Sequence, residues 1–250
     1  MSSNRSLVII PTYNEKENIK LLLEAILALP VAFEVLIVDD GSPDGTADIV
    51  RSMQATHPDQ VHLLERPGKQ GLGTAYIMGF RYAIQQSYDY IFEMDADFSH
   101  NPEDLVRLHE ACAEQAYDLA IGSRYVTGVN VVNWPIRRVL ISYFASQYVR
   151  WVTGMPVNDA TAGFKCYRRR VLEVIDPDRV QFVGYAFQIS MKFNAWKHGF
   201  RITEVPIIFT DRTRGVSKMS SKIFWEAFAG VIIMKVRSLF RKYADYGSQP

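Results

Sequence analysis

The chain has 250 residues, 48% hydrophobic and 22% charged, a composition that supports a sizeable core and excludes wholesale disorder. Its two cysteines, Cys112 and Cys166, exclude a disulfide scaffold, and no Cys/His cluster has zinc-ligand spacing, so we expect a reducing compartment. The formal net charge of +1 is the sum of −10 over residues 1–125 and +11 over residues 126–250, so either the basic half faces an anionic partner or the two halves pair with each other.

The first half of the chain alternates short apolar runs with helical patterns. Apolar runs predict strands at 7–10, 35–38, 61–64, 90–94 and 119–121, and helical periodicity predicts helices at 19–27, 44–53, 73–85 and from Pro102 onward. Strands separated by helices are typical of right-handed βαβ units. We therefore predict an α/β fold with a mostly parallel central sheet and helices on both faces.

The second half is less regular. Residues Ile136–Val152 are apolar around nearly the whole helical circumference, with arginines near both ends. Residues Ile202–Phe209 predict a strand that Pro206 interrupts, which favours a sheet edge. From Ser221 a final helical pattern leads into a basic tail.

Neither apolar helix reaches the ~18 uncharged residues of a convincing membrane span. Both combine an apolar body with aromatic residues and flanking Lys/Arg, which is typical of helices that lie in a membrane interface. Ordinary core helices are the alternative, and for the last helix the two readings stay equal. For Ile136–Val152 we favour the interface, because residues apolar all round are hard to bury in a domain of this size.

Polar signatures follow four of the predicted strands, at the carboxyl ends where parallel α/β sheets bind ligands. The most informative is Asp95-Ala96-Asp97, because two carboxylates with water and phosphate oxygens are the usual Mg²⁺ or Mn²⁺ environment. A bare D-x-D carries little weight alone, but four such signatures on one side of a sheet are hard to dismiss. The metal would clamp a diphosphate, and the candidates to neutralise it further are Arg124, Arg212 and Lys218.

The same edge offers groups for a nucleoside. We expect Asp40 to accept hydrogen bonds from a base, Tyr13 to stack on that base and Glu15 to hold ribose hydroxyls. The glycines of Gly68–Gly73 have neither the P-loop nor the dinucleotide order, so this stretch is either a loop near the ligand or a turn and helix start. His100 follows the acidic pair and is more readily a helix-entry residue than a base.

Five motifs, in order P-T-Y-N-E, V-D-D-G-S-P-D-G-T, D-A-D-F-S-H, G-S-R-Y and D-R-T-R-G-V-S-K, resemble glycosyltransferase family 2 with the GT-A fold. The resemblance covers roughly residues 6–220 and is greatest to the dolichyl-phosphate (polyprenyl-phosphate) mannose synthases. It also includes Gly184–Gln188 and Trp134-Pro135. It implies a single domain over 1–250, with a nucleotide- and metal-binding half at 1–125, an acceptor half at 126–220 and an amphipathic, basic C-terminal helix at 221–250.

The resemblance also implies roles for individual residues. Metal would be held mainly by Asp97, with Asp95 and with Ser99, which stands where some relatives have glutamine; Arg138 and Ser142 would bind the acceptor phosphate. Ser190 departs from the acidic residue common at its position. The residues implied to bind GDP-mannose are Pro11, Tyr13, Glu15, Val38, Asp40, Asp95, Ala96, Asp97, Arg124, Arg212 and Lys218, and those expected to carry catalysis are Asp95, Asp97 and Arg124.

The implied reaction is an inverting, Mg²⁺- or Mn²⁺-dependent transfer of mannose from GDP-mannose to a polyprenyl monophosphate, giving a β-linked product. An anionic phosphate acceptor needs no general base, which agrees with the lack of a convincing catalytic histidine. The alternatives are UDP-glucose as donor, a saccharide acceptor, or a nucleotide-sugar binding module without turnover.

The same resemblance suggests where the protein acts. The chain lacks the C-terminal transmembrane extension of some relatives, so we expect peripheral association with the cytoplasmic face of a membrane and allow for a membrane-anchoring subunit. A nucleic-acid partner is not expected, because the basic residues adjoin apolar helices rather than exposed stacking aromatics.

Overall fold

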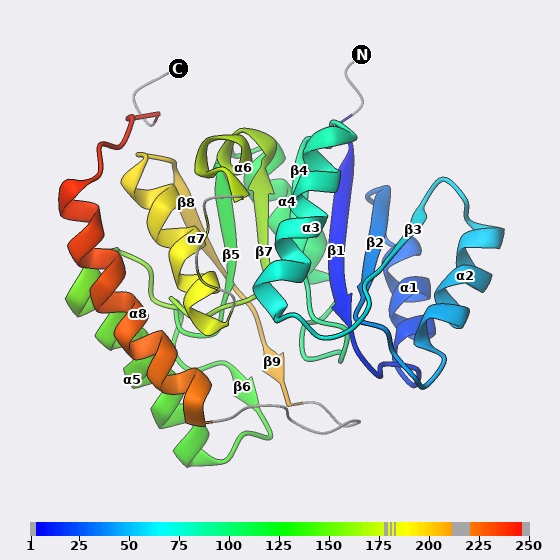
Figure 1. Ribbon diagram of the computed structural model, residues 1–250, viewed down its shortest axis with the longest axis horizontal. Helices are drawn as coiled ribbons and strands as arrows, with labels where there is room; N and C mark the ends of the chain where they lie inside the picture. Colours follow the sequence, from blue (N-terminus) through cyan, green and yellow to red (C-terminus); the bar gives the residue numbers. More distant parts are fainter. Residues whose placement is uncertain (1–3, 178–179, 181, 183, 212–220, 247–250) are drawn as a thin grey trace.

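A seven-stranded sheet with helices on both faces forms the body of the molecule (Figure 1). The computed structural model describes residues 4–177, 180, 182, 184–211 and 221–246, except for the side chains of Tyr185 and residues 221–227. The strands of the sheet are, in spatial order, β3 (Val61–Glu65), β2 (Phe33–Asp39), β1 (Ser6–Thr12), β4 (Tyr90–Glu93), β7 (Lys165–Arg168), β5 (Leu119–Ser123) and β8 (Ile202–Pro206). Strand β7 is antiparallel to both neighbours and the other pairs are parallel.

The helices cover the two faces of this sheet in two groups. Those on one face are α1 (Ile19–Leu27), α2 (Thr46–Thr56) and α4 (Asp104–Ala113). Those on the other are α3 (Leu72–Gln85), α5 (Ile136–Thr153), α6 (Arg169–Ile175), α7 (Tyr185–Lys197) and α8 (Ser221–Phe240). A separate parallel pair is formed by β6 (Val131–Val132) and β9 (Phe209–Thr210).

Alternation along the central strand explains the two cores. In β1, Leu7 and Ile9 face the α3 side, whereas Val8 and Ile10 face the α1 side, and all four are fully buried. Helix α3 approaches β1 closely because Gly79 has no side chain. A Cβ there would lie 2.6 Å from Ile9.

The predicted α/β architecture is confirmed, and each of the five predicted strands is present. The strand predicted to be an edge is confirmed as β8, which ends at Pro206 on the rim of the sheet. The antiparallel strand β7 and the helices α6 and α7 were not predicted.

Carboxyl ends of the parallel strands meet at one edge of the sheet, the lower edge in Figure 1. There Thr12 pairs in register with Asp39, and Asp40, Asp95 and Arg124 follow shortly after the ends of β2, β4 and β5. The four polar signatures singled out in the sequence therefore lie along the same edge.

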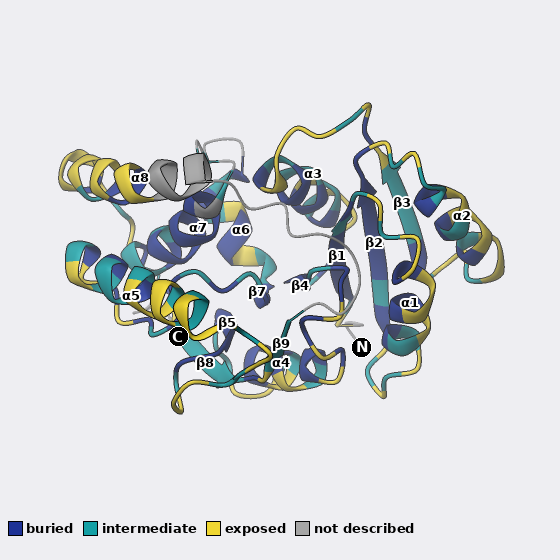
Figure 2. Cartoon of the chain, turned by 90° about the horizontal axis from the view of Figure 1, so that it is seen from below, coloured by how far each residue is buried: buried dark blue, intermediate teal, exposed yellow. Residues whose placement is uncertain are grey.

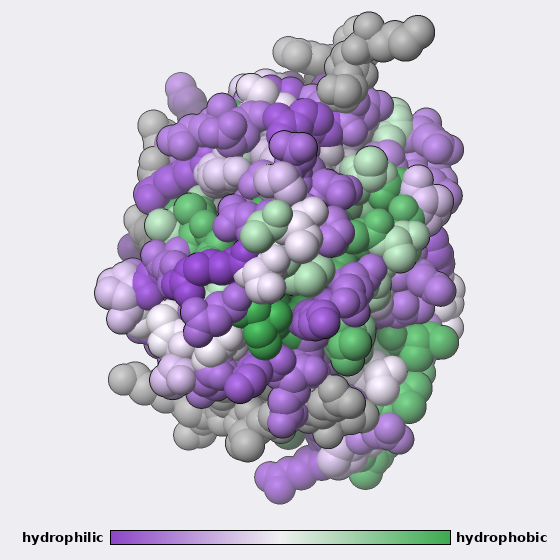
Figure 3. Space-filling model, turned by 90° about the vertical axis from the view of Figure 1, so that its right-hand side faces the viewer, coloured by the Kyte–Doolittle hydropathy of each residue, from purple (hydrophilic) through white to green (hydrophobic). Residues whose placement is uncertain are grey.

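Helices α5 and α8 pack beside each other (Figures 1 and 2). Both expose apolar side chains. Only Ser146, Val149 and Thr153 of α5 are buried, whereas Trp151 is 86% exposed. We define the α5/α8 apolar surface by the exposed residues Ile136, Leu140, Ile141, Tyr143, Phe144, Trp151, Phe228, Ile232, Ile233, Val236, Leu239 and Phe240. The face of the molecule at the α2 side is largely hydrophilic (Figure 3). Within the described ranges, no helix is both long and apolar enough to cross a membrane.

Candidate functional site

The β2–α2 turn is built by Asp39, which prepares the place of Asp40. The Asp39 carboxylate accepts hydrogen bonds from the Thr12 hydroxyl at 2.8 Å and from the Ser42 amide at 2.8 Å. Gly41 has φ +67°, and a Cβ there would lie 3.2 Å from the Arg66 carbonyl oxygen, so the tight turn requires glycine. Asp39 is therefore a structural acid, and Asp40 is the carboxylate left for a ligand.

Asp40 is held by an arginine that sequence reasoning missed. Arg66, just beyond β3 and largely buried, donates from Nε to Asp40 Oδ1 at 2.6 Å and from Nη1 to the Thr74 hydroxyl at 2.7 Å. Burial raises the pKa of the Asp40 carboxyl, and Arg66 opposes that effect. The pair fixes the direction in which Asp40 presents its carboxylate. A hollow of about 440 Å³ lies beside Arg66.

Tyr13 lies under a lysine of the glycine-containing loop. Lys69 Nζ is 3.7 Å from the centre of the Tyr13 ring, and Gly71 caps the start of α3. The stretch Gly68–Gly73 therefore includes the turn and helix start that the sequence allowed. It also lies beside Tyr13, and its place near a ligand stays a prediction. Glu15 is half-buried, and its carboxylate accepts a hydrogen bond from Asn18 at 3.0 Å. Of the other residues expected around the nucleotide, Pro11 and Val38 are register partners in β1 and β2, and Ala96 is buried between the two aspartates.

The segment Asp95–Asp97 follows β4 and turns sharply. Asp97 is buried, and its Oδ1 accepts a hydrogen bond from the Ser99 amide at 3.1 Å and another from the Ser99 hydroxyl. Phe98 has φ 58°, a left-handed conformation that brings Ser99 back to Asp97. Ser99 therefore supports Asp97 from close by, whatever further role its hydroxyl has.

The donor set in this segment fits a hard divalent cation. It offers two carboxylates and a hydroxyl, and among the described residues no group of three or more His, Cys, Asp and Glu side chains could hold a metal by itself. Mg²⁺ and Mn²⁺ are commonly held by one or two carboxylates together with water and substrate phosphate. The residues present therefore suit a cation that binds along with a diphosphate.

His100 is a packing residue rather than a base. Its ring stacks on Phe164 with centroids 4.7 Å apart, and burial lowers its pKa to about 4, with Arg124 adding to the effect and Asp97 opposing it. The ring is therefore neutral at physiological pH. Asp97 and Arg124 both act electrostatically on the His100 ring, so both lie near it.

Arg124 is bound to a buried carboxylate that the sequence did not reveal. Asp159 accepts from the Arg124 amide at 3.0 Å, from Nε at 2.7 Å and from Nη2 at 2.7 Å, and Nη2 also donates to the Thr161 hydroxyl at 2.9 Å. Asp159 is fully buried. Burial raises the pKa of this carboxyl, but Arg124 outweighs that and leaves the pKa lowered. Arg124 is thus fixed in one orientation at the end of β5.

The two residues expected to bind the acceptor phosphate, Arg138 and Ser142, lie one turn apart in α5. Arg138 donates to Asp211 Oδ1 at 2.7 Å, and its guanidinium is 4.1 Å from the centre of the Trp134 ring. Strand β9, which ends just before Asp211, contacts the turn after Asp97, because the Thr210 amide donates to the Ser99 carbonyl oxygen at 3.2 Å. The predicted diphosphate ligands Arg212 and Lys218 lie outside the described residues.

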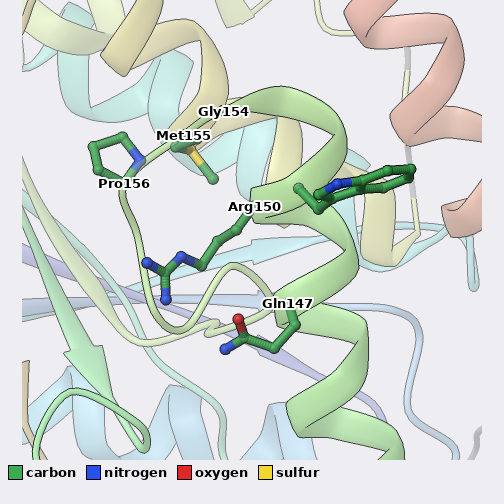
Figure 4. A pocket seen from close by; sticks show the side chains of 6 residues that line it. Gln147, Arg150, Gly154, Met155 and Pro156 are labelled. Atoms are coloured by element: carbon green, nitrogen blue, oxygen red, sulfur yellow. The ribbon is translucent and has the colours of Figure 1, made fainter.

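A second hollow, of about 380 Å³, opens at the far end of α5 (Figure 4). Arg150 and Gln147 extend toward it from the helix, and Arg150 donates to Asn158 Oδ1 at 2.8 Å. None of the residues predicted to bind donor or acceptor lines it.

Several ion pairs join the two halves of the chain. Asp89 binds Arg169 at 2.5 Å, and Asp118 binds Arg170 at 2.6 Å. Glu93 binds Lys165 at 2.9 Å in the interior. Pairing between the acidic and basic halves therefore accounts for part of the charge separation.

Comparison with known proteins gives one family and one enzyme class. Residues 7–176 match the family Glycosyl transferase family 2. A polyprenol monophosphomannose synthase from Mycolicibacterium smegmatis is 46% identical over 235 residues, which are 94% of this chain and 88% of the relative. An undecaprenyl-phosphate mannosyltransferase from Micrococcus luteus is 48% identical over 227 residues, 91% of this chain and 92% of the relative.

Solved structures show the same fold at low sequence identity. Glucosyl-3-phosphoglycerate synthase from Mycobacterium tuberculosis, in complex with Mn²⁺, UDP and glucosyl-3-phosphoglycerate, has a TM-score of 0.70 at 16% identity, covering 94% of this chain and 81% of that chain. A mannosyltransferase from Pyrobaculum calidifontis, in complex with GDP-Man and Mn²⁺, has a TM-score of 0.55 at 19% identity, covering 94% of this chain and 74% of that chain. The expected GT-A fold is thereby confirmed.

Proposed function

The chain belongs to glycosyl transferase family 2 and is a glycosyltransferase, and on this basis we propose that it transfers mannose from GDP-mannose to a polyprenyl monophosphate at a membrane surface. The two relatives at 46% and 48% identity, both named for mannosyl transfer to polyprenyl phosphates, support the sugar and the acceptor. The donor nucleotide, the metal and the membrane association are part of the proposal.

One observation in the structure supports a lipid phosphate as the acceptor. Helix α5 begins beside the carboxyl edge of the sheet with Arg138 and Ser142, and the same helix exposes Ile136, Leu140 and Phe144. A cation followed along one helix by apolar side chains suits a ligand with an anionic head and a hydrocarbon tail. A saccharide acceptor has no hydrocarbon chain to bury against such a surface.

The donor would lie across the ends of β1, β2 and β4. Asp40, oriented by Arg66, can accept hydrogen bonds from the N–H groups of guanine, and Tyr13 can stack on the ring. A divalent cation held by Asp95, Asp97 and the donor's diphosphate would neutralise charge on the departing GDP. Arg124, held by Asp159 just after β5 on the same edge, would contact the diphosphate.

Transfer then needs positioning more than proton movement. An oxygen of the acceptor phosphate attacks C1 of mannose as the C1–O bond to GDP breaks, so the sugar carbon is inverted and the electron pair leaves with GDP. The phosphate is already an anion at neutral pH and no proton has to be removed. His100 is packed against Phe164, and its pKa of about 4 makes it a weak base, which agrees with a reaction that uses no general base. The role of the protein is to bring two anions together in line.

A transfer assay with purified protein, a short polyprenyl phosphate and Mg²⁺ or Mn²⁺ tests the proposal. We expect labelled sugar to enter the lipid from GDP-mannose much faster than from UDP-glucose, and Asp97→Ala to abolish transfer. Faster transfer from UDP-glucose would refute the donor, and undiminished activity of Asp97→Ala would remove Asp97 from the metal site.

A further inference from the structure

Helix α7 carries two buried polar side chains one turn apart on the same face. Gln188 is 3% exposed and Lys192 is fully buried, because the helix is packed between the sheet and α8. Buried polar groups are costly unless they are hydrogen-bonded. Both are hydrogen-bonded, and their partners lead to two different sides of the candidate site.

Gln188 contacts β4, the strand that leads into the Asp95–Asp97 segment. Its Nε2 donates to Glu93 Oε2 at 2.6 Å, and its Oε1 accepts from Lys165 Nζ. Glu93 is the last residue of β4, two positions before Asp95, and its other oxygen is bound by Lys165 at 2.9 Å and by the Tyr167 hydroxyl at 2.9 Å. The end of β4 is thus fixed by a fully buried set of charged and polar groups.

Lys192 reaches the loop that holds Arg124. Its Nζ donates to the Ala162 carbonyl oxygen at 2.6 Å, and the Ala162 amide donates to the Asp159 carbonyl oxygen at 3.3 Å. Asp159 in turn binds Arg124 through three hydrogen bonds. One helix therefore supports both the segment that leads to the aspartates and the loop that orients the arginine.

We propose that Gln188 and Lys192 are positioning residues, through which α7 holds the Asp95–Asp97 segment and Arg124 in one arrangement for sugar transfer. The kinetic part of this inference rests on the proposed function. Misplacing reacting groups by about 1 Å can cost about 100-fold in rate. The two side chains act through other residues: Gln188 bonds to Glu93 and Lys165, and Lys192 bonds to Ala162.

Matched variants separate the two connections. Gln188→Met keeps the length of the side chain and removes its hydrogen bonds to Glu93 and Lys165. Lys192→Met removes the donor to Ala162, whereas Lys192→Gln keeps an N–H donor. Asn194→Ala is the control on the same helix, since the Asn194 side chain hydrogen-bonds to the Ser190 carbonyl oxygen and to Arg241, and neither contact leads to the two segments.

Hydrogen exchange of the ligand-free protein is the primary measurement, and kcat for transfer is the second. In Gln188→Met we expect about tenfold faster exchange in residues 94–99 but not in 159–162. In Lys192→Met we expect about tenfold faster exchange in residues 159–162 but not in 94–99. Each should lower kcat by about 10- to 100-fold. Lys192→Gln should recover most of the loss, and Asn194→Ala should change neither segment.

Three results would overturn the inference: unchanged exchange in both segments, exchange that rises evenly through the core, or kcat that falls only with the folded fraction. If the wild-type protein transfers no mannose, the proposed function fails. The exchange pattern would still decide whether α7 positions the two segments.

Discussion

Replacing Asp159 by asparagine should destabilise the protein and also remove most of its transfer activity. Asp159 is fully buried and accepts three hydrogen bonds from Arg124, at 3.0, 2.7 and 2.7 Å. Removing one partner of a buried ion pair costs about 3–5 kcal/mol, because the other charge stays buried and unpaired. In a chain of 250 residues each kcal/mol lowers Tm by about 2–4 °C, so we expect a loss of about 6–20 °C.

The pH dependence of stability gives an independent check on the same pair. The pKa of Asp159 is lowered in the folded protein, while in the unfolded chain it should be about 3.9. Its contribution to the free energy of unfolding is therefore fully present above about pH 4 and is lost as the pH falls through the folded-state pKa. Asp159→Asn should lack this part of the acid-induced loss.

Urea denaturation and the transfer assay separate stability from activity. The exposed Asp59→Asn is the control and should stay within about 0.5 kcal/mol of wild type. In the double variant Arg124→Leu/Asp159→Leu, stability should recover relative to Asp159→Asn, because the buried pair is removed as a unit, while transfer stays low. Wild-type stability of Asp159→Asn, or full activity of the double variant, would refute the reasoning.

Three further predictions concern the membrane surface, the donor site and the acid limb of stability. Trp151→Glu should weaken co-sedimentation with anionic lipid vesicles by at least about tenfold without lowering Tm, because burying an apolar side chain contributes about 1.5–3 kcal/mol. Leu21→Glu, on the other side of the molecule, should leave co-sedimentation unchanged. Equal weakening in both variants would contradict an α5/α8 membrane surface. Arg66→Met should weaken GDP binding in calorimetry by about tenfold or more, because Asp40 loses its buried partner. Wild-type affinity would contradict a role of the Arg66–Asp40 pair in base recognition. The pKa of His100 is about 4 in the folded protein and about 6.5 in the unfolded chain, so the free energy of unfolding should fall as the pH drops from about 6.5 toward 4. His100→Phe should flatten that fall in denaturation curves, and an unchanged pH slope would contradict a neutral His100.

Local sequence patterns predicted the first half of the fold well. Apolar runs and helical periodicity are properties of neighbouring residues, so β1 to β5 and the helices between them could be recognised without tertiary information. The edge strand β8 could be recognised too, because Pro206 cannot donate to a neighbouring strand.

The central part of the sheet could not be predicted for a physical reason. Strand β7 reads Lys-Cys-Tyr-Arg, which does not resemble a buried strand, yet Lys165 is fully buried because Glu93 pairs with it. Helix α7 also lacks a clear apolar stripe, since Gln188 and Lys192 face the interior. Polar residues buried by pairing are invisible to hydrophobic patterning.

The candidate site divides in the same way. Asp40, Asp95, Asp97 and Arg124 could be located because they follow recognisable strands. Their supporting partners, Arg66 and Asp159, lie 26 and 35 residues away along the chain from the groups they hold. A single sequence gives no signal for such long-range ion pairs.

The most direct test of the account is mass spectrometry of the lipid recovered from vesicles that contain polyprenyl phosphate, after incubation with the protein, GDP-mannose and Mn²⁺. We expect a polyprenyl phosphate that carries one added hexose, formed with release of GDP and absent from samples with EDTA or Asp97→Ala. GDP-mannose consumed without a glycosylated lipid, or the same lipid product formed in EDTA, would contradict it.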